Sequence, residues 1–117
     1  MADNWYTGNA TEDAEQYRGW LTGYFIDPQH GAARVSDDVE IKWGVHPAGD
    51  QRFAWVVDDQ RTAVLLLISG RFRLDLDVGS VVLNRPGDYV VWGPGVGHSW
   101  EAEADSVVVT IRWPSQG

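Results

Sequence analysis

The chain has 117 residues, 44% hydrophobic and 22% charged, so length and composition predict one globular domain and exclude a largely disordered chain. It contains no cysteine, which excludes disulfides, zinc fingers, iron–sulfur clusters and thiol catalysis. Its 9 Lys and Arg residues against 17 Asp and Glu give a net charge of −8, which disfavours partners such as nucleic acid or an anionic membrane.

The sequence contains no recognisable targeting or membrane-spanning segment. Residues 1–11 are polar and lack the basic region and apolar region of a signal peptide. The longest uninterrupted apolar run, 63–68, is far shorter than the ~20 residues that a membrane-spanning helix needs. We therefore expect a cytoplasmic protein with no membrane contact.

Residues 1–38 show no sustained hydrophobic period and are expected to form an N-terminal extension that packs on the rest of the domain or on a partner. Thr11 is a candidate N-cap for a short helix over 12–17, whose first turn is acidic. A short strand is expected over 23–26, and a surface loop over 29–38.

From residue 39 to residue 117 the pattern is that of short β-strands. In 39–46 apolar and polar residues alternate with a period of two, and 63–68 is a continuous apolar run typical of a buried strand. Turns rich in Gly and Pro separate further expected strands over 53–57, 71–77, 81–83, 89–92, 98–102 and 106–113. These strands, together with 15 valines, predict an all-β sandwich or barrel.

The segment from Gly87 to His98, GDYVVWGPGVGH, resembles the second conserved motif of the cupin family. In that motif a Gly-Asp pair opens a strand, a Pro-Gly-Val turn follows, and a histidine returns into the barrel. Residues 47–49 and 66–70 are similar to the Pro-Gly and Leu-x-Gly frame of the first cupin motif. The resemblance covers 39–113 and implies a single-domain jelly-roll barrel whose mouth binds a small molecule.

The first cupin motif normally supplies two histidines and a glutamate as metal ligands before its final glycine, here Gly70. Other residue types stand near those positions in this chain: Trp55, Val57, Asp59 and Ala63. Only His98 matches a ligand position of the family, and a catalytic divalent metal usually needs three protein ligands. We therefore expect no metal and no other cofactor. The alternative is a non-standard metal site in which His46 and His98 converge with Asp59 or Glu101.

We expect the barrel to enclose an aromatic, largely apolar cavity that suits a small apolar or aromatic ligand. If His98 points into the barrel, the period of two turns Trp100 to the same side, and a similar count turns Trp55 inward. The candidate ligand-binding residues are Trp43, Trp55, Trp92, Trp100, Arg52, Arg112 and Tyr89. Each also has an ordinary structural explanation, such as core packing for the aromatic residues. Arg71 and Arg73 fit cross-strand ion pairs on an outer face better than a ligand site.

Two classes of function remain open. In the first, the protein is an isomerase, lyase or cyclase that works without metal, with His98 as general acid or base and His46 assisting. In the second, it is a non-catalytic module that binds or senses a small ligand. A metal-dependent enzyme with the non-standard ligands is a third alternative. The sequence identifies neither the ligand nor the reaction.

The N-terminal extension carries enough aromatic residues to cover a sheet edge or to exchange with a neighbouring copy: Trp5, Tyr6, Trp20, Tyr24 and Phe25. Because a small single-domain barrel exposes its sheet edges, we expect a homodimer.

Overall fold

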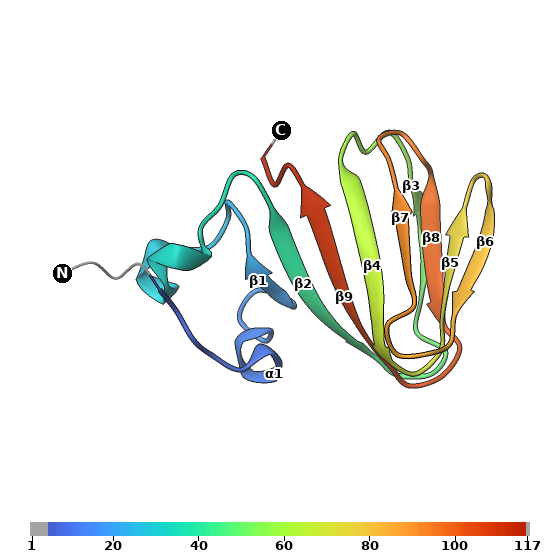
Figure 1. Ribbon diagram of the computed structural model, residues 1–117, viewed down its shortest axis with the longest axis horizontal. Coiled ribbons are helices and arrows are strands. Elements are labelled where there is room, and N and C mark those ends of the chain that lie inside the picture. The colour runs from blue at the N-terminus through green and yellow to red at the C-terminus, as the bar shows by residue number, and fades with distance from the viewer. Residues whose placement is uncertain (1–4, 117) are drawn as a thin grey trace.

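Two antiparallel β-sheets face each other in the computed structural model of the chain, which describes residues 5–116 (Figure 1). The five-stranded sheet has the order β1–β2–β9–β4–β7, and the four-stranded sheet the order β3–β8–β5–β6. The strands are β1 (Trp20–Thr22), β2 (Glu40–His46), β3 (Gln51–Val56), β4 (Thr62–Ser69), β5 (Phe72–Leu76), β6 (Gly79–Leu83), β7 (Tyr89–Trp92), β8 (His98–Ala102) and β9 (Ser106–Trp113). The all-β prediction is confirmed, and every strand expected after residue 38 is present, with bounds shifted by at most two residues.

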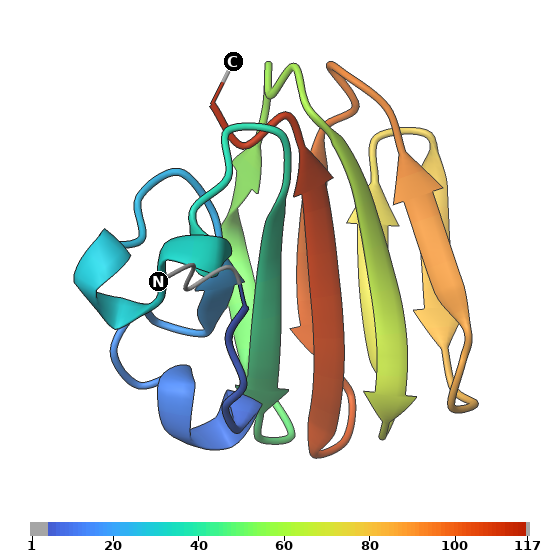
Figure 2. The ribbon, with the colours of Figure 1, turned by 60° about the vertical axis from the view of Figure 1, so that its left-hand side comes forward.

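The N-terminal segment, residues 5–38, lies along the β2 side of the barrel and adds β1 to the five-stranded sheet (Figure 2). Gly19, with φ of +100°, lies so close to β2 that an added Cβ would be 2.6 Å from the Trp43 carbonyl oxygen. The close approach at Gly19 lets the strand begin at Trp20. The strand expected over 23–26 is wrong, since Gly23 forms only an isolated bridge with Val35 and the residues after it form a turn and a bend.

The expected helix begins earlier and is shorter. Helix α1 spans Ala10–Asp13, and its N-cap is Asn9, whose side chain accepts hydrogen bonds from the backbone N–H groups of Thr11 and Glu12 at 3.0 and 3.4 Å. Thr11 is therefore not the cap, because an amide side chain better placed for this role precedes it. Turns follow α1 in place of the helix expected up to residue 17.

The surface loop expected over 29–38 contains two 3₁₀ helices, η1 (Pro28–His30) and η2 (Ala32–Arg34). The Arg34 side chain is buried, and its Nε donates a hydrogen bond of 2.8 Å to the carbonyl oxygen of Leu21 in β1. This bond ties the loop to the strand. Within residues 5–116, no helix has the length and hydrophobicity needed to cross a membrane.

The core lies between the two sheets. Its buried members come from six strands: Ala63, Leu65, Leu67, Phe72, Leu74, Leu83, Trp92, Ala102 and Val108. The apolar run of β4 contributes only alternate residues to this core, since Val64, Leu66 and Ile68 face the opposite side and are less buried. The run is therefore buried on one face and not on both.

The polar residues of β2 and β9 face the space between the sheets. Glu40, at the start of β2, is only 1% exposed, whereas Val45 on the opposite face of that strand is 61% exposed. In β9 the same side is taken by Ser106, Thr110 and Arg112, and the valines next to them point outward or are half-buried. Polar and apolar residues do alternate in 39–46, as expected, but at this end of the barrel the polar residues are the ones that point inward.

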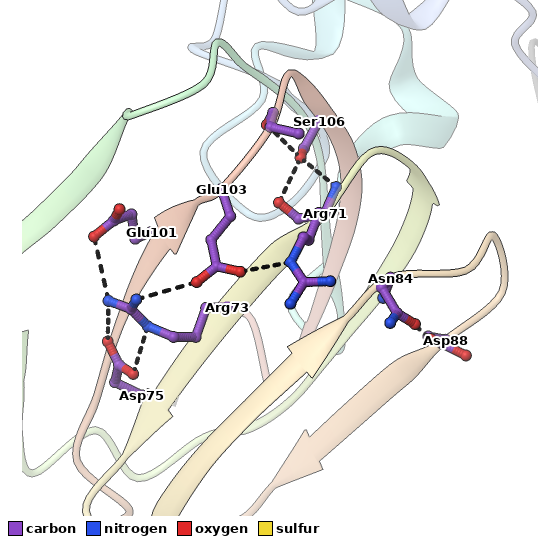
Figure 3. Close-up of polar contacts among 9 residues, drawn as sticks. Arg71, Arg73, Asp75, Asn84, Asp88, Glu101, Glu103 and Ser106 are labelled. Carbon is purple, nitrogen blue, oxygen red and sulfur yellow. Dashed lines mark hydrogen bonds and ion pairs between the residues drawn. The ribbon is translucent and has the colours of Figure 1, made fainter.

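The outer face of the four-stranded sheet carries a network of charged side chains (Figure 3). Arg73 on β5 contacts Asp75 at 2.9 Å, Glu101 on β8 at 3.2 Å and Glu103 at 3.2 Å, and Arg71 contacts Glu103 at 2.8 Å. This placement confirms that Arg71 and Arg73 form ion pairs on an outer face rather than lining the interior.

Candidate functional site

A cavity of about 110 Å³ lies between the two sheets. Four rings line it, those of Trp20, Trp92, Trp100 and His98. Three basic side chains, of Lys42, Arg52 and Arg112, and the Thr110 hydroxyl also line it. The aliphatic side chains of Val56, Leu65 and Leu74 complete the lining. Both sheets contribute, so the cavity forms only when they pack together. Its three cations contradict the largely apolar lining expected from the sequence.

His98 reaches the cavity because of the turn that precedes β8. Gly95 adopts a φ of +82°, and its N–H donates a hydrogen bond of 2.7 Å to the carbonyl oxygen of Asp59, which reverses the chain after β7. The imidazole then lies against the Trp92 ring, with ring centroids 4.8 Å apart. The segment from Gly87 to His98 thus forms the strand, turn and inward histidine that its motif implied.

The tautomer of His98 follows from its hydrogen bond. Nδ1 lies 3.2 Å from the carbonyl oxygen of Val96, and because a carbonyl can only accept, Nδ1 carries the proton. Burial lowers the pKa of the His98 imidazole below its usual value, which favours the neutral ring. A neutral ring protonated at Nδ1 has a basic Nε2. The site therefore holds an imidazole able to accept a proton or a hydrogen bond.

Four charged residues form a network at the end of the cavity, which we call the rim network: Glu40, Asp59, Arg61 and Arg112. Arg112 Nη2 lies 2.6 Å from Glu40 Oε1, and Arg61 contacts both Glu40 and, at 2.9 Å, Asp59 Oδ2. Ser115 Oγ donates a further hydrogen bond of 3.2 Å to the buried Glu40 carboxylate. The two carboxylates match the two guanidinium groups, so the rim network is neutral.

Lys42 and Arg52 lack such partners. In the part of the chain that the structure describes, neither has a carboxylate oxygen within the 4.0 Å of an ion pair. Burial lowers the pKa of the Lys42 ammonium, and the neighbouring charges of Arg112 and Arg52 lower it further. Lys42 Nζ lies 5.5 Å from the Trp20 ring centroid, and the Arg112 guanidinium lies 4.6 Å from the same centroid. The Trp20 ring therefore lies against both cations.

The structure brings together five of the nine residues singled out from the sequence: His98, Trp92, Trp100, Arg52 and Arg112. Trp43, Trp55, Tyr89 and His46 do not line this cavity. Trp43 lies on the outer side of β2, beside the N-terminal segment. Tyr89 is 63% exposed on the outer side of β7. The sequence did not show on which side of the sheet these two residues lie, because a strand has two faces and either can be apolar.

Trp55 is misplaced by an irregularity in β3. Arg52 pairs with Trp100 and Val56 pairs with His98, but the register shifts between these two pairs. An uninterrupted period of two predicts that Trp55 points inward, but its side chain is exposed. The inward positions are those of Arg52 and Val56.

His46 faces the interior but lies beyond Trp100 from the cavity. Its ring centroid is 4.5 Å from that of Trp100 and 5.5 Å from that of Phe72. Its Nδ1 is 2.7 Å from Asp50 Oδ2. Because the Trp100 ring stands between them, His46 is not available to assist His98 at a common ligand.

The residues present do not fit the divalent metal that the cupin resemblance implies. Within residues 5–116 no group of three or more His, Cys, Asp or Glu side chains is placed to hold a metal ion. Glu101 points outward to Arg73, and Asp59 is bound in the rim network. The non-standard ligand set of His46 and His98 with either carboxylate therefore does not converge.

Sequence reasoning missed two of the residues that shape the cavity, Trp20 and Lys42. Lys42 stands on the same side of β2 as Glu40, so the alternation of 39–46 carried the signal once that side was recognised as internal. Trp20 reaches the cavity only because β1 pairs with β2 in the register Trp20↔Lys42. No local pattern in the sequence indicates that pairing.

Comparison with known proteins supports the fold. No family model matches the chain, and no curated protein matches it. Among solved structures, KdgF from Halomonas sp. is 21% identical with a TM-score of 0.60, covering 68% of this chain and 72% of that chain. A cupin protein from Bacteroides fragilis is 20% identical with a TM-score of 0.58, covering 67% of each chain.

A third structure, an RmlC-like cupin from Shewanella frigidimarina, is 18% identical with a TM-score of 0.58, covering 67% of this chain and 68% of that chain. The chain therefore has the cupin jelly-roll fold, as the resemblance of residues 39–113 implied. At these identities the likeness shows the fold alone, so the function has to be argued from the site.

Proposed function

We propose that this protein binds a small molecule in the cavity between its two sheets. The observation that carries the proposal is the convergence of three tryptophan rings and the imidazole of His98 on one cavity between the sheets. Tryptophan rings provide flat apolar contact surface, and a few polar groups among them fix a ligand's orientation. A flat body lying against Trp92 and Trp100 suits this lining.

The size of the cavity limits the ligand. At about 110 Å³ it is smaller than the roughly 300–1,000 Å³ typical of drug-sized ligand pockets. A dry cavity of about 150 Å³ holds a benzene molecule, and this cavity is smaller but open on one side. The proposed ligand is therefore a short-chain compound, or a single-ring compound that lies partly in the open side.

Intrinsic fluorescence provides the test, because three of the tryptophans line the cavity. We would titrate the protein with a panel of single-ring acids, amides and alcohols at millimolar concentrations. Saturable quenching that is lost in Trp100→Leu and in the cavity-filling Thr110→Met, but kept in Trp55→Leu, supports the proposal. Thermal melting of each variant separates lost binding from lost folding. A panel with no saturable member contradicts the proposal.

Catalysis is a second candidate, favoured by the presence of two titratable side chains in the same cavity. His98 presents a basic Nε2, and Lys42 is an ammonium group whose pKa is lowered by burial. Together they are suited to proton transfer on a bound substrate, as in an isomerase, lyase or cyclase. His98→Gln separates the candidates: an enzyme loses turnover of the ligand while binding persists, whereas a binding module has no turnover to lose.

Neither candidate requires a metal or another cofactor. We expect ligand binding to be unchanged after treatment with a chelator. Loss of binding on chelation, with recovery on adding a divalent cation, would instead favour a metal-dependent site.

A further inference from the structure

The cavity contains more positive charge than the residues around it neutralise. The rim network balances its own charges, two carboxylates against two guanidinium groups. Lys42 and Arg52 remain as two cations with no carboxylate within 4.0 Å among residues 5–116. The chain as a whole has a net charge of −8, so this excess of positive charge is confined to the cavity. Cations brought together in a partly buried space repel each other unless an anion joins them.

The positions of the two cations define where an anion would bind. Lys42 enters from β2 and Arg52 from β3, so they stand on different sheets and both line the cavity. The Arg52 side chain is exposed on an edge strand, which places it at the open side. A guanidinium matches the two oxygens of a carboxylate, and an ammonium adds a point charge to either oxygen.

We propose that the ligand of this cavity carries a carboxylate, bound by Lys42 and Arg52, while its apolar body lies against the tryptophan rings. The inference deepens the proposed function and rests on it. Its two parts correspond to the two parts of the lining, the cationic side of Lys42 and Arg52 and the aromatic side of Trp92 and Trp100. A short-chain monocarboxylate satisfies both within about 110 Å³, and a single-ring monocarboxylate does so with its carboxylate toward Arg52 at the open side.

The test compares matched pairs of probes that differ only in charge: benzoate with benzamide, and cyclohexanecarboxylate with its primary amide, in a buffer free of carboxylates. Inorganic phosphate forms a third arm. We expect each acid to bind more tightly than its amide, and Lys42→Met and Arg52→Gln each to weaken the acid about tenfold or more, the loss of a charge-assisted hydrogen bond. The amides should be unaffected by either substitution. Arg85→Gln, in the exposed turn after β6, is the matched control and should change nothing.

The outcomes separate this inference from the proposed function. Equal binding of acid and amide, with both lost in Trp100→Leu, overturns the carboxylate assignment and leaves small-molecule binding standing. Phosphate that binds more tightly than every acid also overturns it, in favour of a phosphate-bearing ligand. Absence of binding by any acid, amide or phosphate overturns both.

Discussion

The outer faces of the two sheets are built on opposite principles. On the four-stranded sheet, β5 and β8 present Arg73, Asp75 and Glu101, joined by ion pairs of 2.9 and 3.2 Å (Figure 3). On the five-stranded sheet the corresponding outward positions of four strands hold aliphatic and aromatic residues and no charge. Charged side chains joined in ion pairs keep the face of the four-stranded sheet in water. The contrast teaches that the outward positions of a strand, like its inward ones, can be either charged or apolar.

The inner face of the five-stranded sheet, unlike its apolar outer face, carries charged residues. Glu40, Lys42 and Arg112 point between the sheets, where apolar residues are expected. Buried charges are tolerated only when they are paired, and those of Glu40 and Arg112 are. Lys42 is the exception, and the ligand carboxylate proposed above would supply the charge that the chain does not.

The largest expected effect comes from breaking the rim network. Glu40→Gln removes the carboxylate that holds Arg61 and Arg112, and leaves their charges facing each other in a buried space. We expect a loss of about 3–5 kcal/mol in the free energy of unfolding, measured by urea denaturation. Glu103→Gln, on the charged outer face, is the control and should leave the unfolding midpoint almost unchanged. Equal losses in the two variants would show that Glu40 is not the centre of the network.

Neighbouring leucines of β4 compare the two faces of one strand. Leu67 is fully buried in the core, whereas Leu66 faces outward next to Val109 and Tyr89. Leu67→Ala should cost about 2–5 kcal/mol in the free energy of unfolding at any protein concentration. Leu66→Ala should cost less, because its side chain is only half-buried. Equal costs in the two variants would contradict the assignment of the two leucines to different faces.

Asp59 gives the rim network a pH dependence. Hydrogen bonds from Arg61 lower the pKa of the Asp59 carboxyl from 3.8 to about 2. A carboxyl whose pKa is lower in the folded chain stabilises the fold above its unfolded pKa, and the stabilisation disappears as the pH falls from about 4 to 2. The shift corresponds to about 2 kcal/mol. Asp59→Asn should remove this share of the acid sensitivity, measured as unfolding midpoints between pH 5 and pH 2; an unchanged slope would contradict the assignment.

Local patterns in the sequence were sufficient for most of the strands. Period-two alternation and Gly-Pro turns located every strand after residue 38, and the segment from Gly87 to His98 identified the fold and one cavity residue. These features depend on residues close together in the chain, where spacing alone fixes the geometry. They explain why His98 and Trp100 were placed correctly.

The rest of the site depends on long-range packing. The prediction that Trp55 points inward was wrong because the register shift in β3 breaks the period of two. No residue in the sequence of β3 indicates that irregularity. Lys42 was missed because hydrophobic alternation says which residues share a face but not which face is the interior. Trp20 enters the cavity through the pairing of β1 with β2, which joins segments about twenty residues apart.

The smallest expected effect tests the charged outer face. Arg73 has contacts with three carboxylates, of Asp75, Glu101 and Glu103, but its side chain is about one-third exposed. Exposed ion pairs contribute between zero and about 1 kcal/mol, because water and salt screen them and ordering the long side chains costs entropy. Arg73→Gln should therefore lower the free energy of unfolding by less than about 1 kcal/mol, and the loss should shrink further in molar salt. A larger loss that persists in salt would mean that this network supports the sheet, so that the two outer faces would differ in their contribution to stability as well as in polarity.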